Sequence, residues 1–167
     1  QDWVDPDVDP RFPGGAEDGI YLSKSPAYRA ANRLFTSVTE LRLVEGMTPE
    51  LFRALEPLIS VLPEETPINI NTAPPELLLA LSSNPAPGEV AAFVENRIDE
   101  PAENLDAVTN DAILGPAVDS QGLSVSTHYF LIQGEATIGR GRVRLYSLVF
   151  RSAQGQARVV YQSRDTL

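Results

Sequence analysis

The hydrophobic pattern of this chain changes its period once, near Gly115-Pro116, and this change determines the fold class. Before that point apolar residues recur at helical spacing, whereas beyond it they alternate with polar residues, which is typical of strands. Strands are predicted over residues 124–138, 142–152 and 157–162, with turns at 139–141 and 153–156. The sequence therefore predicts an α+β protein in which short helices precede an antiparallel sheet.

Residues 26–114 predict five or six short helices, one of them over residues 27–34 and a weaker one over residues 104–114. The centre of this part is the segment 68–81, where a short alternating stretch leads through two prolines into a Leu-rich helix. Proline suits the first turn of a helix, and we expect Asn71 or Thr72 to accept hydrogen bonds from its free amides. This segment should be the middle of a small helical core.

The second predicted strand is apolar on both faces. Val143, Leu145 and Val149 alternate with a second set on the opposite face, Arg144, Tyr146, Leu148 and Phe150. A three-stranded sheet with two apolar faces needs a cover, and little of this chain is left to supply one. We expect a segment outside these 167 residues to pack against the sheet.

The charge is strongly acidic and unevenly distributed. The formal net charge is −10, and residues 1–120 hold 7 basic and 21 acidic side chains, against 6 and 2 in residues 121–167. This balance argues against binding to nucleic acid, because cations that neutralise phosphates supply most of that affinity. The absence of cysteine excludes disulfides and thiolate metal sites. No run approaches the roughly 20 apolar residues of a membrane span. Because the chain begins at Gln1 and shows no signal peptide, we expect a soluble portion of a longer protein; a processed mature protein is the alternative.

The first 19 residues form a loop rich in Asp, Pro and Gly, with candidate metal ligands. Asp5, Asp7 and Asp9 alternate, as the first ligands of a calcium loop do, and Glu17 and Asp18 follow at a distance that could close a site. The loop lacks the Gly and Glu that an EF-hand requires at its sixth and twelfth positions. Oxygen ligands favour calcium over zinc or copper. From the spacing alone, a calcium site and a solvated acidic loop are equally good interpretations.

The residues argue against two other classes of function. His128 is the only histidine and lies within a predicted strand, where a structural role is usual, and the segment 122–126 lacks the last glycine of a nucleophile elbow. We therefore expect no enzyme. The segment 68–81 also resembles the start of helix-hairpin-helix nucleic-acid-binding modules. The turn over residues 82–88 has a single glycine and three prolines or alanines where such modules offer amides to phosphate, so this remains the alternative.

The whole chain, in order, resembles the type II secretion minor pseudopilin K family, also called general secretion pathway protein K. Six segments carry the resemblance: Asp2-Trp3-Val4-Asp5-x-Asp7, Gly15-Ala16-Glu17-Asp18 with Tyr21, residues 26–32, residues 38–42, residues 69–74, and residues 122–130. Their order along the chain is what makes the resemblance strong.

The resemblance implies a type IV pilin-like antiparallel sheet, whose N-terminal helix is absent from this chain, with a large inserted all-helical domain containing a helix-hairpin-helix-like unit. The domains would be an acidic loop and start of the pseudopilin core (1–25), the inserted helical domain (26–115) and the C-terminal sheet (116–167). The family also implies bound calcium, one or two ions; with the spacing, this selects Asp5, Asp7, Glu17 and Asp18 as ligands.

The implied role is structural and without catalysis. Pseudopilin K would form the tip of the periplasmic pseudopilus with minor pseudopilins I and J, and their ternary complex would start assembly of the filament. The process is protein export across the outer membrane of a Gram-negative bacterium. The full-length protein would be anchored in the inner membrane through the N-terminal helix. No nucleic acid is expected as a partner.

Overall fold

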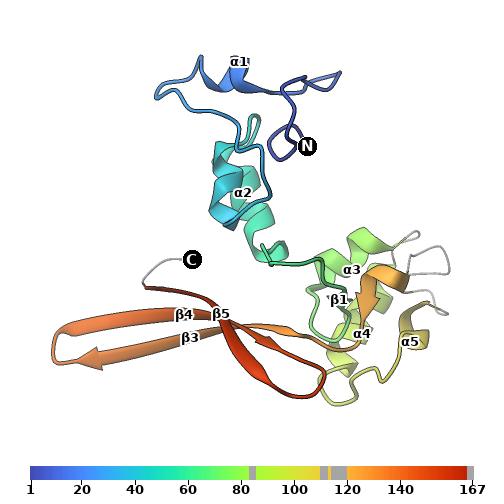
Figure 1. The fold of residues 1–167 in the computed structure, drawn as a ribbon. Coiled ribbons are helices and arrows are strands. Elements are labelled where there is room, and N and C mark those ends of the chain that lie inside the picture. Colours follow the sequence, from blue (N-terminus) through green and yellow to red (C-terminus); the bar gives the residue numbers. More distant parts are fainter. Residues whose placement is uncertain (83–85, 110–112, 114–119, 165–167) are drawn as a thin grey trace. The chain divides into compact units, whose positions relative to one another are not determined.

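The computed structural model describes residues 1–82, 86–109, 113 and 120–164 (Figure 1). The chain packs into two compact units, Gln1–Pro63 and Glu64–Leu167, which we call the N-terminal and the C-terminal unit. Each contains its own cluster of buried apolar residues. The structure thus confirms an α+β protein with helices before an antiparallel sheet.

The N-terminal unit contains little regular structure. Its elements are α1 (Asp18–Tyr21), the 3-10 helix η1 (Val38–Leu43), α2 (Pro49–Leu55) and the 3-10 helix η2 (Glu56–Leu58). Thr48 caps α2, because its hydroxyl accepts a hydrogen bond from the Leu51 amide at 3.2 Å. Long irregular segments join these short helices (Figure 1), so the unit depends on contacts between loops.

The core of the N-terminal unit is aromatic. Trp3 and Tyr21 are buried with ring centroids 5.1 Å apart in an edge-to-face arrangement, and Tyr28 lies 5.4 Å from Tyr21. Such pairs contribute about 0.5–1.5 kcal/mol beyond the area they bury. The Tyr28 hydroxyl donates to the Leu43 carbonyl at 2.8 Å and the Tyr21 hydroxyl accepts from the Glu45 amide at 3.3 Å. The rings therefore connect the first loop to the segment after η1.

The helix predicted over residues 27–34 is absent, and the sequence prediction was wrong there. The Ala30 amide donates to Asp18 Oδ1 at 3.1 Å, and the Asn32 amide donates to the Trp3 carbonyl at 3.0 Å. Asn32 also adopts a left-handed backbone with φ of 47°. These long-range hydrogen bonds replace the helical ones, so tertiary contacts override the good helix propensity of the segment.

The helical part of the C-terminal unit includes a short parallel pair of strands. β1 (Ile68–Asn69) pairs with β2 (Leu123–Ser124), and α3 (Pro75–Leu81), α4 (Pro87–Asn96), α5 (Asp106–Thr109) and the 3-10 helix η3 (Ser120–Gly122) lie between them in the sequence. The buried residues are aliphatic: Ile70, Ala73, Leu78, Val90, Val108 and Leu123. The segment 68–81 is therefore central to this core, as its pattern predicts.

Neither Asn71 nor Thr72 caps α3, contrary to the prediction. The residue before α3 is Pro74, which makes no side-chain cap. Asn71 instead donates to the Ala102 carbonyl at 2.9 Å and to the Val125 carbonyl at 3.2 Å, and it accepts from the Ala102 amide at 2.9 Å. Its side chain thereby joins three segments that are distant in sequence.

The antiparallel sheet has the order β3 (Tyr129–Ile138), β4 (Gly141–Arg151), β5 (Ala157–Arg164). The stretch predicted as one strand over residues 124–138 is interrupted between β2 and β3. The turn at 139–140 uses Gly139 at φ 59°, a left-handed conformation that favours glycine. The register between β4 and β5 shifts between Leu148 and Val149. The β3–β4 hairpin extends past the end of β5 (Figure 1).

The sheet presents large apolar side chains to solvent. On the face that carries Val149, the exposed residues are Phe130, Ile132, Ile138, Val143 and Val159, and on the other face they are Leu131 and Tyr161. Ile138 is 85% exposed and Val159 is 58% exposed. Exposed apolar patches of this kind mark surfaces that another segment or protein covers.

The packing of the chain divides it between Pro63 and Glu64, inside the range 26–115 that the sequence assigns to one helical domain. The domain boundaries near residues 25 and 115 stay predictions, and the second falls among residues 114–119, outside the described part. Among the described residues, no helix has the length and apolar character that crossing a membrane requires.

A candidate metal centre in the N-terminal loop

The N-terminal loop is closed by contacts among Asp2, Arg11 and Gly15, which we call the clasp. The Arg11 amide donates to Asp2 Oδ2 at 3.0 Å, and the Gly15 amide donates to the Arg11 carbonyl at 2.7 Å. Asp2 is only 6% exposed, and the Arg11 amide lowers its pKa against the opposing effect of burial. The clasp brings the segment after Gly15 back to the start of the chain.

Three of the predicted ligands meet inside this loop. Asp5, Asp7 and Glu17, which we call the acidic cluster, each offer one carboxylate oxygen, and these oxygens lie within 4.8 Å of one another. Asp7 Oδ1 also accepts a hydrogen bond from the Asp9 amide at 3.0 Å. The Arg11 guanidinium lies 3.9 Å from Asp5 Oδ2, so one cation partly offsets the negative charge.

The buried oxygens of the acidic cluster lack partners. Glu17 is 5% exposed, and neither of its oxygens has a hydrogen-bond partner; Asp5 Oδ1 is also buried and unpaired. Burial, followed by the negative charges of Asp2, Asp5, Asp7 and Asp18, raises the pKa of Glu17 above its ordinary value. A buried carboxylate without a partner is costly, so the arrangement suits a cation that would satisfy these oxygens.

Asp18 is not brought to the acidic cluster, which differs from the prediction. Its Oδ2 accepts from Arg29 Nη1 at 2.5 Å, and its Oδ1 accepts from the Ala30 amide. Both oxygens therefore hold the segment that the sequence predicted as a helix. Asp9 contributes its backbone amide to Asp7, and its carboxylate does not join the cluster.

The donor set of the acidic cluster fits a hard cation. All three ligands are carboxylates, which suit calcium, and calcium takes six to eight oxygens from side chains, backbone carbonyls and water. Three carboxylates would supply part of such a shell. The unpaired, 95%-buried Glu17 is the observation that separates this arrangement from a solvated acidic loop.

The residues behind the alternative functions have structural partners. Arg97, the one basic residue between residues 64 and 120, donates to the Ile70 carbonyl at 2.5 Å and the Ala73 carbonyl at 2.8 Å. Both terminal nitrogens of its guanidinium thus hold backbone carbonyls next to the start of α3. His128 Nδ1 lies 3.0 Å from the Arg151 carbonyl, while Ser124 and Ser126 contact each other.

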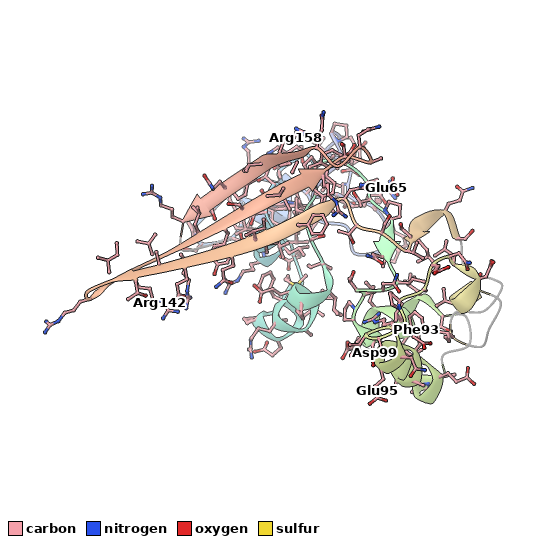
Figure 2. All side chains as sticks on the ribbon, turned by 90° about the horizontal axis from the view of Figure 1, so that it is seen from below. Glu65, Phe93, Glu95, Asp99, Arg142 and Arg158 are labelled. Carbon is pink, nitrogen blue, oxygen red and sulfur yellow. The ribbon has the colours of Figure 1, made fainter. Side chains whose placement is uncertain are left out.

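Charge is also separated within the C-terminal unit. Figure 2 shows Arg142 toward the tip of the β3–β4 hairpin and Arg158 elsewhere on the sheet, whereas Glu95 and Asp99 lie on the helical part. Glu135 pairs with both Arg142 and Arg144, so two of the three arginines near the hairpin tip already have a carboxylate partner.

Sequence reasoning missed the clasp. The alternation of carboxylates singles out Asp5, Asp7 and Asp9, and nothing in the local pattern pairs Asp2 with Arg11 or Arg11 with Gly15. The signal was present in the Gly14-Gly15 pair, because glycine often marks a close approach of two backbones. The backbone partner of such a glycine lies at a distance that a single sequence does not reveal.

Two family profiles described as type II secretion system (T2SS), protein K match the chain, over residues 1–64 and 68–126. The type II secretion system protein K of Pseudomonas aeruginosa is 38% identical over 160 residues, covering 95% of this chain and 47% of that protein. The protein K of Aeromonas hydrophila is 31% identical over 159 residues, covering 90% of this chain and 48% of that protein. The chain thus spans about half the length of these relatives.

A solved structure supports the same assignment. A chain in the crystal structure of the GspK-GspI-GspJ complex from enterotoxigenic Escherichia coli superimposes with a TM-score of 0.78 and 25% identity, covering 99% of this chain and 61% of that chain. The junction between the two family profiles also coincides with the division between the two compact units. Sequence, unit boundaries and fold therefore agree, and the chain belongs to the type II secretion system protein K family.

Proposed function

We propose that this chain is the periplasmic part of a minor pseudopilin that forms the tip of the type II secretion pseudopilus. It would act with minor pseudopilins I and J in a ternary complex that starts assembly of the filament for protein export. The likeness over 99% of the chain to a protein of the GspK-GspI-GspJ complex is the observation that carries this proposal. The role is structural.

The exposed apolar face of the sheet supports a pilin-like core completed by the rest of the longer protein. Phe130, Ile132 and Val159 lie on that face and are exposed. An N-terminal helix packed there would bury them and, continuing beyond the sheet, would anchor the protein in the inner membrane. The bulk of the helical segments inserted before the sheet would prevent a further subunit from adding above this one, as a tip requires.

We further propose that the acidic cluster holds calcium. Asp5, Asp7 and Glu17 would contribute carboxylate oxygens, and the positive charge of the ion would offset the cost of burying Glu17. The bound ion would fix the start of the chain against the residues that precede α1. Calcium is thus assigned a role in stability.

The partner proposal is tested by size-exclusion chromatography with light scattering. This chain is mixed with the soluble domains of minor pseudopilins I and J, in calcium and in chelator. A stable 1:1:1 complex is the expected result. If no complex forms, the run is repeated with a longer stretch of the protein that includes the proposed N-terminal helix. Failure of both chains to bind would contradict the proposal.

The calcium proposal is tested by thermal unfolding of the double variant Asp5→Asn with Asp7→Asn. We expect its melting temperature to fall below that of the parent protein in calcium but not in chelator. The matched control is Asp9→Asn, because this exposed carboxylate lies in the same loop outside the acidic cluster. Equal shifts with and without calcium, or an equal effect of the control, would refute the site.

A further inference from the structure

Gly15 lies where no side chain fits. A Cβ atom built on it would lie 2.3 Å from the Arg11 amide nitrogen, 2.3 Å from Asp2 Oδ2 and 2.5 Å from the Arg11 carbonyl oxygen. Two of these atoms belong to the backbone, so rotation of a side chain cannot relieve the overlap. Glycine is therefore required at this position because two segments of the loop approach too closely to leave room for a Cβ atom.

The clasp is connected to the acidic cluster from both sides. Gly15 precedes Glu17 by two residues, and Asp2 precedes Asp5 by three. Forcing Gly15 away from Arg11 would displace Glu17 relative to Asp5 and Asp7, whose oxygens now lie within 4.8 Å. A displacement of this kind affects the spacing of the oxygens without removing any of them.

Asp2 has a different role from the carboxylates of the acidic cluster. Its Oδ2 is engaged by the Arg11 amide at 3.0 Å, and its Oδ1 lies 4.0 Å from Arg11 Nε. In Asp5 and Glu17, by contrast, buried oxygens have no partner. Asp2 thus holds the backbone of the loop, whereas Asp5 and Glu17 offer oxygens to its interior.

We propose that Asp2 and Gly15 are positioning residues for the cation, setting the separation of Asp5, Asp7 and Glu17 through the clasp. This inference rests on the metal site proposed above. It assigns an effect on metal affinity to two residues that would not touch the ion, through a hydrogen bond and a close backbone approach.

The test uses terbium, a luminescent substitute for calcium, with Trp3 as the donor. Trp3 is the only tryptophan and lies two residues from Asp5 in the chain. Terbium is titrated into the 167-residue protein and then displaced with calcium. The variants are Gly15→Ala, Asp2→Asn and Asp2→Ala. The matched control is Gly19→Ala, because a Cβ at Gly19 meets nothing within 4 Å and the backbone there is not left-handed.

Overpacking typically costs about 1–3 kcal/mol. The metal-free loop can open to relieve the overlap, and binding has to close it again, so Gly15→Ala should weaken calcium affinity by roughly fivefold to 150-fold. Gly19→Ala should leave it unchanged. Asp2→Asn keeps an oxygen for the Arg11 amide and should stay within about fivefold of the parent, since it loses one charge that the Arg11 guanidinium at 4.0 Å already partly offsets. Asp2→Ala loses the hydrogen bond and should weaken affinity at least as much as Gly15→Ala.

The outcomes separate this inference from the metal site itself. No terbium luminescence with the parent protein would overturn the metal site, and the inference with it. Parent-like affinity in Gly15→Ala would overturn the inference alone. Asp2→Asn as weak as Asp2→Ala would make Asp2 a ligand. If Gly15→Ala fails to fold, as judged by near-UV circular dichroism, the two Asp2 variants decide, since neither adds bulk.

Discussion

The N-terminal unit and the helical part of the C-terminal unit both consist of short helices joined by loops, yet their interiors differ in chemistry. The C-terminal unit buries aliphatic side chains such as Leu78, Val90 and Val108, whereas the N-terminal unit buries aromatic rings together with Asp2 and Glu17. Burial of aliphatic side chains stabilises the folded state without any bound partner. A buried carboxylate destabilises the folded state unless a hydrogen-bond donor or a cation pairs with it. The stability of the N-terminal unit should therefore depend on a ligand.

Truncation of the aliphatic core should give the largest effect. Leu78 has no exposed surface, and Leu78→Ala should lower the free energy of unfolding of the C-terminal unit by roughly 2–5 kcal/mol. Urea unfolding is followed by two signals: circular dichroism of the sheet, which reports on the C-terminal unit, and Trp3 fluorescence, which reports on the N-terminal unit. Only the transition seen by circular dichroism should move. A parallel shift of the Trp3 transition would show that the units unfold together and remove the contrast.

Calcium removal should act on the other unit. Saturating calcium at about 100 times its dissociation constant stabilises the folded state by about 2.7 kcal/mol, which for a unit of this size corresponds to roughly 10–20 °C. Chelator should therefore lower the Trp3-reported melting temperature and leave the sheet transition in place. Magnesium at equal concentration is the control, because its demand for octahedral geometry disfavours a loop site.

The pH dependence of the N-terminal unit should change sign with calcium. Without metal, the raised pKa of Glu17 means that protonation favours the folded state. That stability is fully present below the unfolded pKa and is lost as the pH rises through the folded one. With calcium, acid removes the ionised ligands and weakens binding. Trp3-reported stability should therefore rise on acidification from neutral pH toward 5 in chelator, and fall in calcium.

Glu17→Gln isolates this effect. The amide keeps the shape of the side chain without its charge, so the variant should exceed the parent in stability at neutral pH in chelator and fall below it in calcium. It should also lose the metal-free pH slope. A variant less stable than the parent under both conditions would show that Glu17 is a structural residue whose charge the fold requires.

Surface charge should contribute least. Arg53 and Glu50 form an exposed pair on α2 at 2.9 Å, with side chains 69% and 74% exposed. Arg53→Gln should change the stability of the N-terminal unit by no more than about 0.5 kcal/mol. A larger loss in chemical denaturation would mean that surface pairs, and not the buried carboxylates, hold this unit together.

Local patterns predicted the elements whose causes are local. Alternation predicted β4 and β5, and Thr48-Pro49 has the residues typical of the helix start that α2 shows, because turn and cap chemistry acts within a few residues. The spacing of the N-terminal carboxylates also selected three residues that the fold brings together. The sequence therefore predicted the class of fold and the part of the chain where the candidate site lies.

The prediction errors arose where contacts with residues distant in the sequence determine the local structure. Residues 27–34 have good helix formers, but Asp18 and Trp3 take their amides. Asp18 has a carboxylate that could bind a metal, but Arg29 donates a hydrogen bond to one of its oxygens. Asn71 and Arg97 resemble ordinary polar residues, although each holds backbone carbonyls more than 20 positions away in the chain. No periodicity encodes such pairs.

The parallel pairing of β1 with β2 has a consequence for how this protein folds as it is made. Ile68 pairs with Leu123, and Leu123 belongs to the same buried cluster as Ile70 and Leu78. The helical core thus stays open at the ribosome until the residues just before the sheet emerge, and its formation carries the entropic cost of a long loop. A fragment ending at the predicted boundary near residue 115 would lack its last core residue and should fold poorly in isolation.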